Sequence, residues 1–205
     1  MGGQGSKLDK MKAGAGEKAS HRKKYLPQTN GSSPAVNGMS PDNSCPSIEE
    51  QQVELPSFTE RQKELVTDTW RVVQEDMAKV GVVIFIKLFE THPEVQNVFM
   101  PFRGQSQETL RESAQLKSHA LRVMGTVDKC ISRFQEPDKV KEMLHELGAR
   151  HVIYNAKVDY MDLIGPQFIW AIEPVLGDRW TPEVEQAWSD LFKFVSYIMK
   201  DAMNF

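Results

Sequence analysis

Two histidines lie on the apolar faces of two separate predicted helices, and this pairing constrains the chain more than any other feature. The first apolar stripe has the three- and four-residue spacing of one helix face and consists of Leu116, His119, Ala120, Val123, Met124 and Val127. The second has the same spacing and consists of Val140, Met143, Leu144, Leu147, Gly148 and His151. A lone core histidine usually bonds to a nearby polar group, because leaving it without a partner costs about 1–3 kcal/mol. Two such histidines favour a buried metal or haem instead, since imidazole nitrogen is a common ligand of iron.

The composition of the chain changes at about residue 54. Residues 1–54 are rich in Gly, Ser, Pro, Asn and Lys and contain few large apolar side chains. Such a segment cannot bury enough surface to offset the entropy lost on ordering. Residues 55–205 carry the helical periodicity, and the whole chain has 205 residues, 40% of them hydrophobic. We therefore expect a disordered basic tail over residues 1–54 and one globular domain over residues 55–205.

The first residues of the tail match a lipidation pattern. Gly2 follows the initial methionine and Ser6 stands at the sixth position, as in N-myristoylation signals. Up to residue 24, seven basic side chains face only two acidic ones. One acyl chain binds a membrane only reversibly, and each basic residue near an anionic leaflet adds about 1 kcal/mol. Two interpretations stay open, namely an anchor at Gly2 on an anionic membrane surface and a solvated leader without a membrane role.

Several other classes of protein are disfavoured. No apolar run approaches the length of a membrane-spanning helix, and no signal-peptide core follows the start. Two cysteines are too few for a disulfide framework and favour a reducing compartment. Cys130 continues the first stripe, so we expect it to be a small buried hydrophobic residue. The basic cluster lacks the interleaved aromatic residues of nucleic-acid binders, so no nucleic-acid partner is expected.

The globular part is predicted to be entirely helical. Thr59 and Gln62 have the spacing of a capping box at a helix start. Pro93 ends the second helix or begins a new turn. Pro137 marks the start of the helix that carries His151, and Thr181 caps the last helix ahead of a proline.

Residues 55–205 resemble the globin family, in particular its globin X branch, with cytoglobin and neuroglobin as neighbours. Trp70 falls where globins have the tryptophan of the first helix. Phe99 follows Pro93 by six residues, the family's spacing between an interhelical proline and the phenylalanine that packs on the haem. The run from Gln115 to Gly125 is similar to the distal helix of cytoglobin. The run from Leu147 to His151 is similar to the proximal helix of the family.

The resemblance implies an all-α globin fold, with about eight helices around a pocket for haem b. His151 would bind the haem iron as the proximal ligand, and the 32-residue step from His119 suits the distal-to-proximal separation of the family. His119 would either hydrogen-bond a bound diatomic molecule or bind the iron directly. The likeness to cytoglobin and neuroglobin favours direct binding, which gives a six-coordinate bis-histidyl iron. The other implied cofactor-binding residues are Phe85, Phe99, Phe102, Arg122 and Val123.

Those five residues have separate implied roles. Phe99 would stack on the porphyrin and Phe102 would close the same corner, while Phe85 and Val123 would line the distal pocket. Each of these has plain core packing as its alternative. Arg122 would pair with a haem propionate, or it would simply be a surface arginine.

Two further features follow from the likeness. Gly81 and Ala120 would let two helices cross closely. A helix is expected over residues 157–176, but it contains Pro166 and Pro174 where globins keep one continuous helix. We therefore expect these prolines to bend or interrupt it.

Three functions compete at this point. The first is a globin that reversibly binds dioxygen, nitric oxide and carbon monoxide, as in oxygen transport or storage. The second is a haem redox protein supplied by an unknown reductase, acting in nitrite reduction, nitric oxide dioxygenation or electron transfer. The third is a haem-free helical bundle in a membrane-attached interaction protein. The expected location is the cytoplasmic face of the cell membrane, with lipid attachment, or the cytoplasm.

Overall fold

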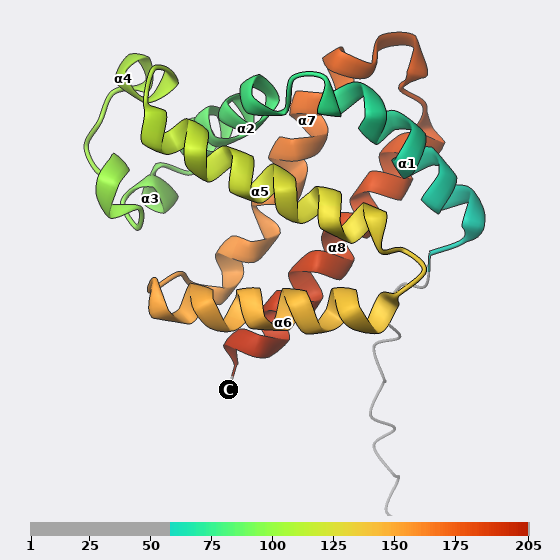
Figure 1. The fold of residues 1–205 in the computed structure, drawn as a ribbon. Coiled ribbons are helices and arrows are strands. Elements are labelled where there is room, and N and C mark those ends of the chain that lie inside the picture. Colours follow the sequence, from blue (N-terminus) through green and yellow to red (C-terminus); the bar gives the residue numbers. More distant parts are fainter. Residues whose placement is uncertain (1–57, 205) are drawn as a thin grey trace, which may run out of the picture. The chain divides into compact units, whose positions relative to one another are not determined.

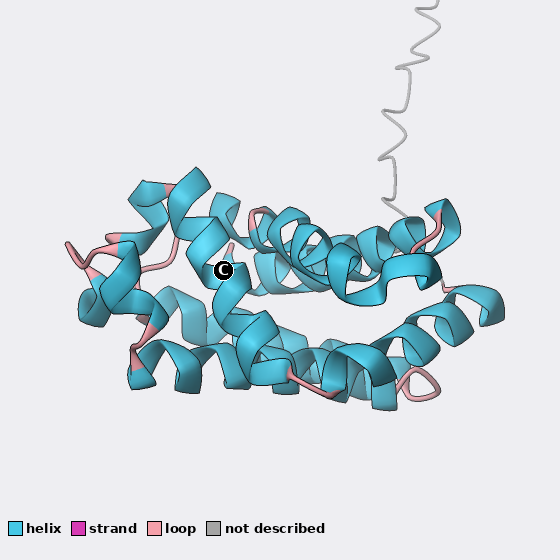
Figure 2. Ribbon diagram, turned by 90° about the horizontal axis from the view of Figure 1, so that it is seen from above, coloured by secondary structure: helices cyan, strands magenta, loops and turns pink. Residues whose placement is uncertain are grey.

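The computed structural model describes residues 58–204, and Gly2 and the expected boundary at residue 54 lie outside this part of the chain (Figure 1). Every regular element in the described part is a helix, and it contains no strand (Figure 2). The α-helices are α1 (Glu60–Gln74), α2 (Met77–Thr91), α3 (Pro93–Gln96), α4 (Gln107–Arg111), α5 (Ala114–Ser132), α6 (Pro137–Ile153), α7 (Ile164–Leu176) and α8 (Pro182–Met203). The shorter 3₁₀ segments are η1 (Met100–Phe102), η2 (Val158–Asp162) and η3 (Gly177–Arg179). Within residues 58–204, no helix combines the length and the apolar character needed to cross a bilayer. The all-helical prediction is confirmed.

The first helix begins at the predicted capping box. The Thr59 hydroxyl accepts a hydrogen bond from the Gln62 backbone N–H at 3.2 Å, and the Thr59 backbone N–H donates to Gln62 Oε1 at 3.0 Å. Two groups that a helix start would otherwise leave unpaired are thereby satisfied. The same logic holds at α8, where the Thr181 hydroxyl accepts from the Val184 N–H at 3.2 Å.

Aromatic side chains from three helices form the centre of the core. Trp188 of α8 lies 5.1 Å from Phe168 of α7 and 6.0 Å from Trp70 of α1, measured between ring centroids. The buried Trp188 indole N–H donates to the Thr69 hydroxyl at 3.0 Å. Trp70 donates its indole N–H to Asp128 of α5 at 2.8 Å. Each large ring thus buries its apolar surface while its one polar group stays paired.

Two close helix crossings set the positions of α5 and α6. A Cβ atom at Gly81 of α2 would lie 3.0 Å from the Ala120 Cβ of α5, so the predicted close crossing at this pair is confirmed. A Cβ atom at Gly148 of α6 would lie only 2.4 Å from the Met199 carbonyl oxygen of α8. α5 is therefore held against α2, and α6 against α8, while α5 and α6 make almost no direct contact.

The prediction for residues 157–176 was wrong in its details. The segment forms the 3₁₀ turn η2 first, and α7 then runs without interruption from Ile164 to Leu176. Pro166 falls in the first turn of α7, where the backbone N–H groups need no helical partner. Pro174 lies in the last turn, close to the point where the helix ends in any case. Neither proline interrupts the helix.

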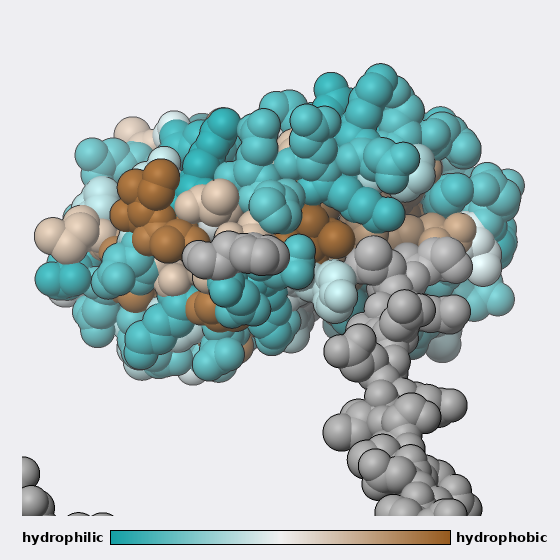
Figure 3. Space-filling model, turned by 90° about the horizontal axis from the view of Figure 1, so that it is seen from below, coloured by the Kyte–Doolittle hydropathy of each residue, from teal (hydrophilic) through white to brown (hydrophobic). Residues whose placement is uncertain are grey.

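The face seen in Figure 3 shows hydrophobic, brown surface near its middle and at one side. Brown surface gathers at the side where the C-terminal end of α6 lies. That end carries Val152, Ile153 and Tyr154, of which Ile153 is 80% exposed. Cys130, by contrast, is buried, as predicted, and burial raises the pKa of its thiol to about 12.

Candidate functional site

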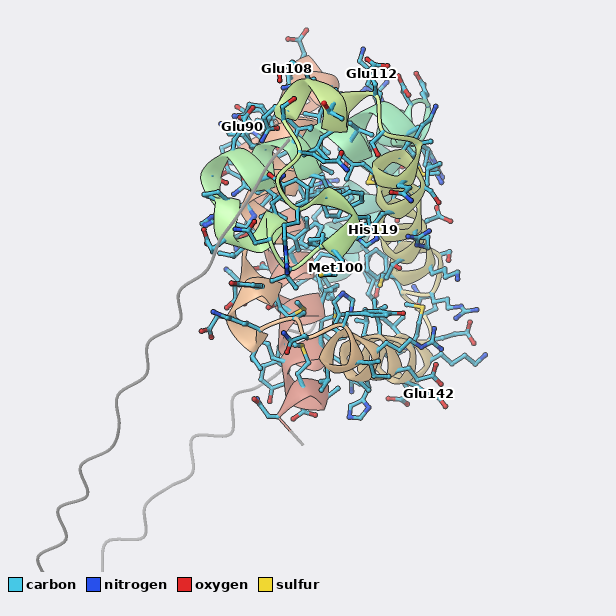
Figure 4. The ribbon with its side chains drawn as sticks, turned by 90° about the vertical axis from the view of Figure 1, so that its left-hand side faces the viewer. Glu90, Met100, Glu108, Glu112, His119 and Glu142 are labelled. Carbon is cyan, nitrogen blue, oxygen red and sulfur yellow. The ribbon has the colours of Figure 1, made fainter. Side chains whose placement is uncertain are left out.

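His119 of α5 lies among aromatic rings from other elements. Its imidazole centroid is 4.9 Å from that of Phe85 on α2 and 5.2 Å from that of Phe99, and both rings meet it edge to face. Figure 4 shows His119 above Met100 near the middle of the view, with the labelled glutamates towards the periphery. His119 is half-buried, and the stripe positions on either side of it pack into the same apolar cluster.

The surroundings keep the His119 ring neutral. Burial lowers the pKa of His119 from 6.5 to about 4, and the positive charge of Arg122 acts in the same direction. The ring is therefore uncharged at neutral pH and has a lone pair on one nitrogen.

His151 lies in the last turn of α6 with its proton position fixed. Its Nδ1 lies 2.8 Å from the Leu147 carbonyl oxygen, one turn earlier. A carbonyl only accepts hydrogen bonds, so Nδ1 carries the proton and donates it. The neutral ring then has its lone pair on Nε2, the arrangement that metal-binding histidines use.

The chain leaves α6 after Ile153, two residues beyond His151, through a tight turn. Asn155 has a positive φ of 58°, a conformation that asparagine tolerates better than most residues. The Ala156 N–H returns to the His151 carbonyl oxygen at 3.1 Å. The helix end is thus closed on the histidine's own backbone, and this limits the movement of its ring.

An aromatic corner borders His119 on one side. The Phe99 and Phe102 rings are stacked with centroids 5.7 Å apart, and Phe102 is buried. Gln96, a buried polar side chain, donates to the Phe102 carbonyl at 2.8 Å and to the Gln105 carbonyl at 3.0 Å. These two bonds tie together a stretch that has little helix of its own. Neither composition nor spacing signals this role of Gln96.

A cavity of about 420 Å³ opens beside this corner. Its lining includes Phe99, Phe102, Ser118, His119 and Arg122. The lining thus combines aromatic rings with hydroxyl, imidazole and guanidinium groups. Such a mixed lining suits a flat, largely apolar molecule that carries an anionic edge.

The structure brings most of the predicted site residues together. Phe85, Phe102 and the partly buried Phe99 and Val123 belong to one apolar cluster on the α2–α5 side. Arg122 is exposed at its rim. His151, on α6, is not among the residues that line the cavity beside His119. Gly148 was overlooked as a positioning residue, because a glycine within an apolar stripe looks like any other small core residue.

These groups fit the haem that the sequence suggested. His151 offers its Nε2 from a ring that Leu147 orients through Nδ1, and His119 offers a neutral imidazole on a different helix. Phe85 and Phe99 supply apolar ring faces, and Arg122 is a cation at the edge of the cavity. Two nitrogen ligands, an apolar enclosure and a cationic rim match iron, macrocycle and carboxylates respectively.

Comparisons with known proteins agree with this geometry. The family model described as Globin matches residues 82–199. Cytoglobin-2 of Danio rerio is 29% identical over 136 residues, which cover 65% of this chain and 76% of that protein. Neuroglobin of Tetraodon nigroviridis is 25% identical over 143 residues, covering 69% of this chain and 89% of that protein.

Solved structures share the fold at lower identity. A hexacoordinated haem protein from an anhydrobiotic tardigrade, solved at pH 4, superposes with a TM-score of 0.69 and 18% identity, covering 74% of this chain and 97% of its own. Ferric myoglobin of Aplysia limacina superposes with a TM-score of 0.64 and 20% identity, covering 71% of this chain and 99% of its own. At these identities the likeness establishes the arrangement of helices.

Proposed function

The chain belongs to the globin family, whose cofactor is haem b, and from that membership we propose that it is a bis-histidyl globin that reversibly binds dioxygen. Nitric oxide and carbon monoxide are the other diatomic ligands of the proposal. The observation that carries it is the His151 ring, whose Nδ1 proton is committed to the Leu147 carbonyl so that Nε2 is free to bind iron. When bound, haem supplies an iron that takes up small diatomic ligands and exchanges one electron.

His151 acts as the proximal residue in this proposal. The hydrogen bond to Leu147 fixes the tautomer and the orientation of the ring, and it raises the basicity of Nε2. The close packing of Gly148 on α8 keeps the whole last turn of α6 in place. His151 would therefore hold the haem from a fixed position.

His119 acts as the distal residue and binds the iron directly in the resting state. Its low pKa supports this role, because a protonated imidazole has no lone pair to offer a metal. External ligands then bind only to the fraction of molecules in which His119 is displaced, and their apparent affinity falls by that fraction. A protein with the same fold is itself described as hexacoordinated.

The remaining residues shape the pocket. Phe99 stacks on the porphyrin and Phe102 closes the corner, while Phe85 and Val123 limit the space next to His119. Their contacts support these roles, since Phe85 touches both the Phe99 and the His119 rings. Arg122, at the exposed rim, is the candidate partner of a propionate.

Uptake of hemin by the purified full-length chain tests this proposal. We expect His151→Ala to weaken hemin uptake strongly, because the proximal nitrogen is lost. His145→Ala is the matched control, since it removes an imidazole from an exposed position of the same helix. Equal uptake by the His151→Ala variant and the unmodified chain would overturn the proposal.

Redox chemistry is the second candidate function. A bis-histidyl iron changes its charge with little rearrangement of its ligands, which favours electron transfer, nitrite reduction or nitric oxide dioxygenation with a reductase as partner. The neutral His119 beside the cavity is the observation that favours this candidate. The lifetime of the oxygenated ferrous protein separates the two. A long lifetime supports storage or transport, whereas fast turnover with nitrite or nitric oxide and a reductant supports catalysis.

We also propose that the chain falls in the globin X branch and is anchored to the cytoplasmic face of a membrane. The lipidation pattern at Gly2 and the basic cluster behind it support this assignment. Gly2→Ala is expected to lower the membrane-bound fraction in cells, and Gly3→Ala is the control because it leaves the acceptor glycine intact. An unchanged fraction for Gly2→Ala would exclude the anchor.

A further inference from the structure

The contact between Arg122 and His119 determines which nitrogen of His119 carries the proton. Arg122 Nη2 lies 3.3 Å from His119 Nδ1. A guanidinium group only donates hydrogen bonds and keeps its protons at any ordinary pH, so Nδ1 has to be the acceptor. The proton of the neutral ring is therefore on Nε2, opposite to its place in His151.

A neighbouring hydroxyl holds the arginine in this position. Arg122 Nη1 donates to the Ser118 hydroxyl at 3.0 Å, one turn earlier on the same helix. The guanidinium thus spans two acceptors, Ser118 and His119, which precede Arg122 on α5 by four and three residues and so lie within its reach. Because the bond to Ser118 already restricts the Arg122 side chain, less conformational entropy is lost when the guanidinium contacts the His119 ring.

The two tautomers of His119 suit opposite tasks. With the proton on Nε2, the ring can donate a hydrogen bond into the pocket but has no lone pair there for iron. To bind iron through Nε2, the ring has to carry its proton on Nδ1 instead. That N–H would then face the N–H of Arg122, and two donors cannot form a hydrogen bond with each other. Contact with Arg122 and binding to iron therefore exclude each other.

We propose that Arg122 is a positioning residue that biases His119 away from the iron and so raises the fraction of the protein open to diatomic ligands. This inference rests on the proposed bis-histidyl state and names the device that regulates it. Release of the guanidinium, for example to a propionate, frees the ring to bind iron. Docking of the guanidinium on Nδ1 keeps the ring in its hydrogen-bond-donating form.

The equilibrium constant for His119 binding to ferrous iron tests the proposal, measured by rapid mixing with carbon monoxide. Arg122→Met keeps an unbranched side chain and removes the charge and the donors, and Arg122 is exposed, so the fold tolerates the change. We expect the constant to rise roughly threefold to tenfold, the change that one lost hydrogen bond produces. Arg122→Lys keeps a charged donor at this position, so its constant should lie between those of Arg122→Met and the unmodified protein. Ser118→Ala should give a smaller rise.

Lys117→Ala is the matched control for charge. It removes one positive charge from an exposed position of α5 that lies away from the His119 face, and we expect no change in the constant. A constant for Arg122→Met equal to that of the unmodified protein, or an equal rise in Lys117→Ala, would overturn the proposal.

The C–O stretching frequency of the ferrous carbonyl form supplies an independent readout. A donating Nε2–H lowers this frequency, so Arg122→Met should shift the population towards higher values, and an unchanged spectrum would contradict the tautomer assignment. Failure of the Arg122 proposal can be distinguished from failure of the bis-histidyl proposal. If the unmodified protein shows no step in which His119 leaves the iron, the bis-histidyl proposal fails, while the carbonyl spectrum still decides the role of Arg122.

Discussion

Replacing Gly148 by alanine tests how the structure holds the proximal helix. The added Cβ would lie 2.4 Å from the Met199 carbonyl oxygen, 2.9 Å from the Met199 Cα and 3.0 Å from the Ala202 Cβ. Two of these neighbours are backbone atoms, which no change of rotamer can move, so α6 and α8 have to separate. Overpacking of a core typically costs about 1–3 kcal/mol, and we take the upper end here. The better helix propensity of alanine returns about 1 kcal/mol, which leaves a net loss of about 2 kcal/mol.

For a domain of this size, that loss corresponds to a fall of roughly 4–8 °C in the thermal midpoint, followed by far-UV circular dichroism. Gly125→Ala is the matched control, because a Cβ at Gly125 of α5 would meet nothing within 4 Å. We expect this variant to be stabilised by about 1 kcal/mol, through helix propensity alone. A Gly148→Ala variant as stable as the unmodified chain would refute the close approach of α6 to α8.

Two further predictions concern buried polar groups. Thr69→Val removes the acceptor of the buried Trp188 indole N–H, so the free energy of unfolding in urea should fall by about 1–3 kcal/mol; a loss below a few tenths would mean that the indole finds another partner. The depressed pKa of His119 makes the haem-free chain lose stability as the pH falls from 6.5 to about 4, because the unfolded state takes up a proton that the folded state resists. The same acid titration of His119→Leu should show a smaller loss across that window, and an identical loss would contradict the burial of this ring.

Patterns within single helices were readable from the sequence. The stripes that contain His119 and His151 gave the buried faces of α5 and α6, since an apolar face repeats every three or four residues whatever it packs against. The capping box at Thr59 was readable for the same reason, because its two partners are three residues apart. Gly81 and Ala120 were identified as a crossing only through the resemblance to globins.

Features that depend on contacts between distant segments were not readable. Gly148 is critical only because Met199, far along the chain, lies against it. Pro166 was expected to disturb a helix, but the real start of α7 at Ile164 makes its position harmless. Gln96 appeared to be an ordinary polar residue, although it is buried and holds the aromatic corner. In each case the local sequence is compatible with several outcomes, and tertiary packing selects one.

The internal chemistry of the candidate site was not readable from the sequence. Spacing and resemblance pointed to two histidines and to aromatic residues, of which the structure places Phe85 and Phe99 beside His119. Nothing in the sequence distinguishes the tautomers of the two histidine rings. Those depend on a carbonyl that faces one Nδ1 and a guanidinium that faces the other. The difference arises from three-dimensional hydrogen bonding, which a linear pattern does not encode.

The absorption spectrum of the reduced, ligand-free holoprotein tests the central claim most directly. If imidazoles from α5 and α6 bind the same iron, the spectrum is that of a low-spin six-coordinate haem, and it changes to a high-spin five-coordinate form in His119→Leu. A high-spin five-coordinate spectrum in the unmodified protein, identical to that of His119→Leu, would contradict the claim.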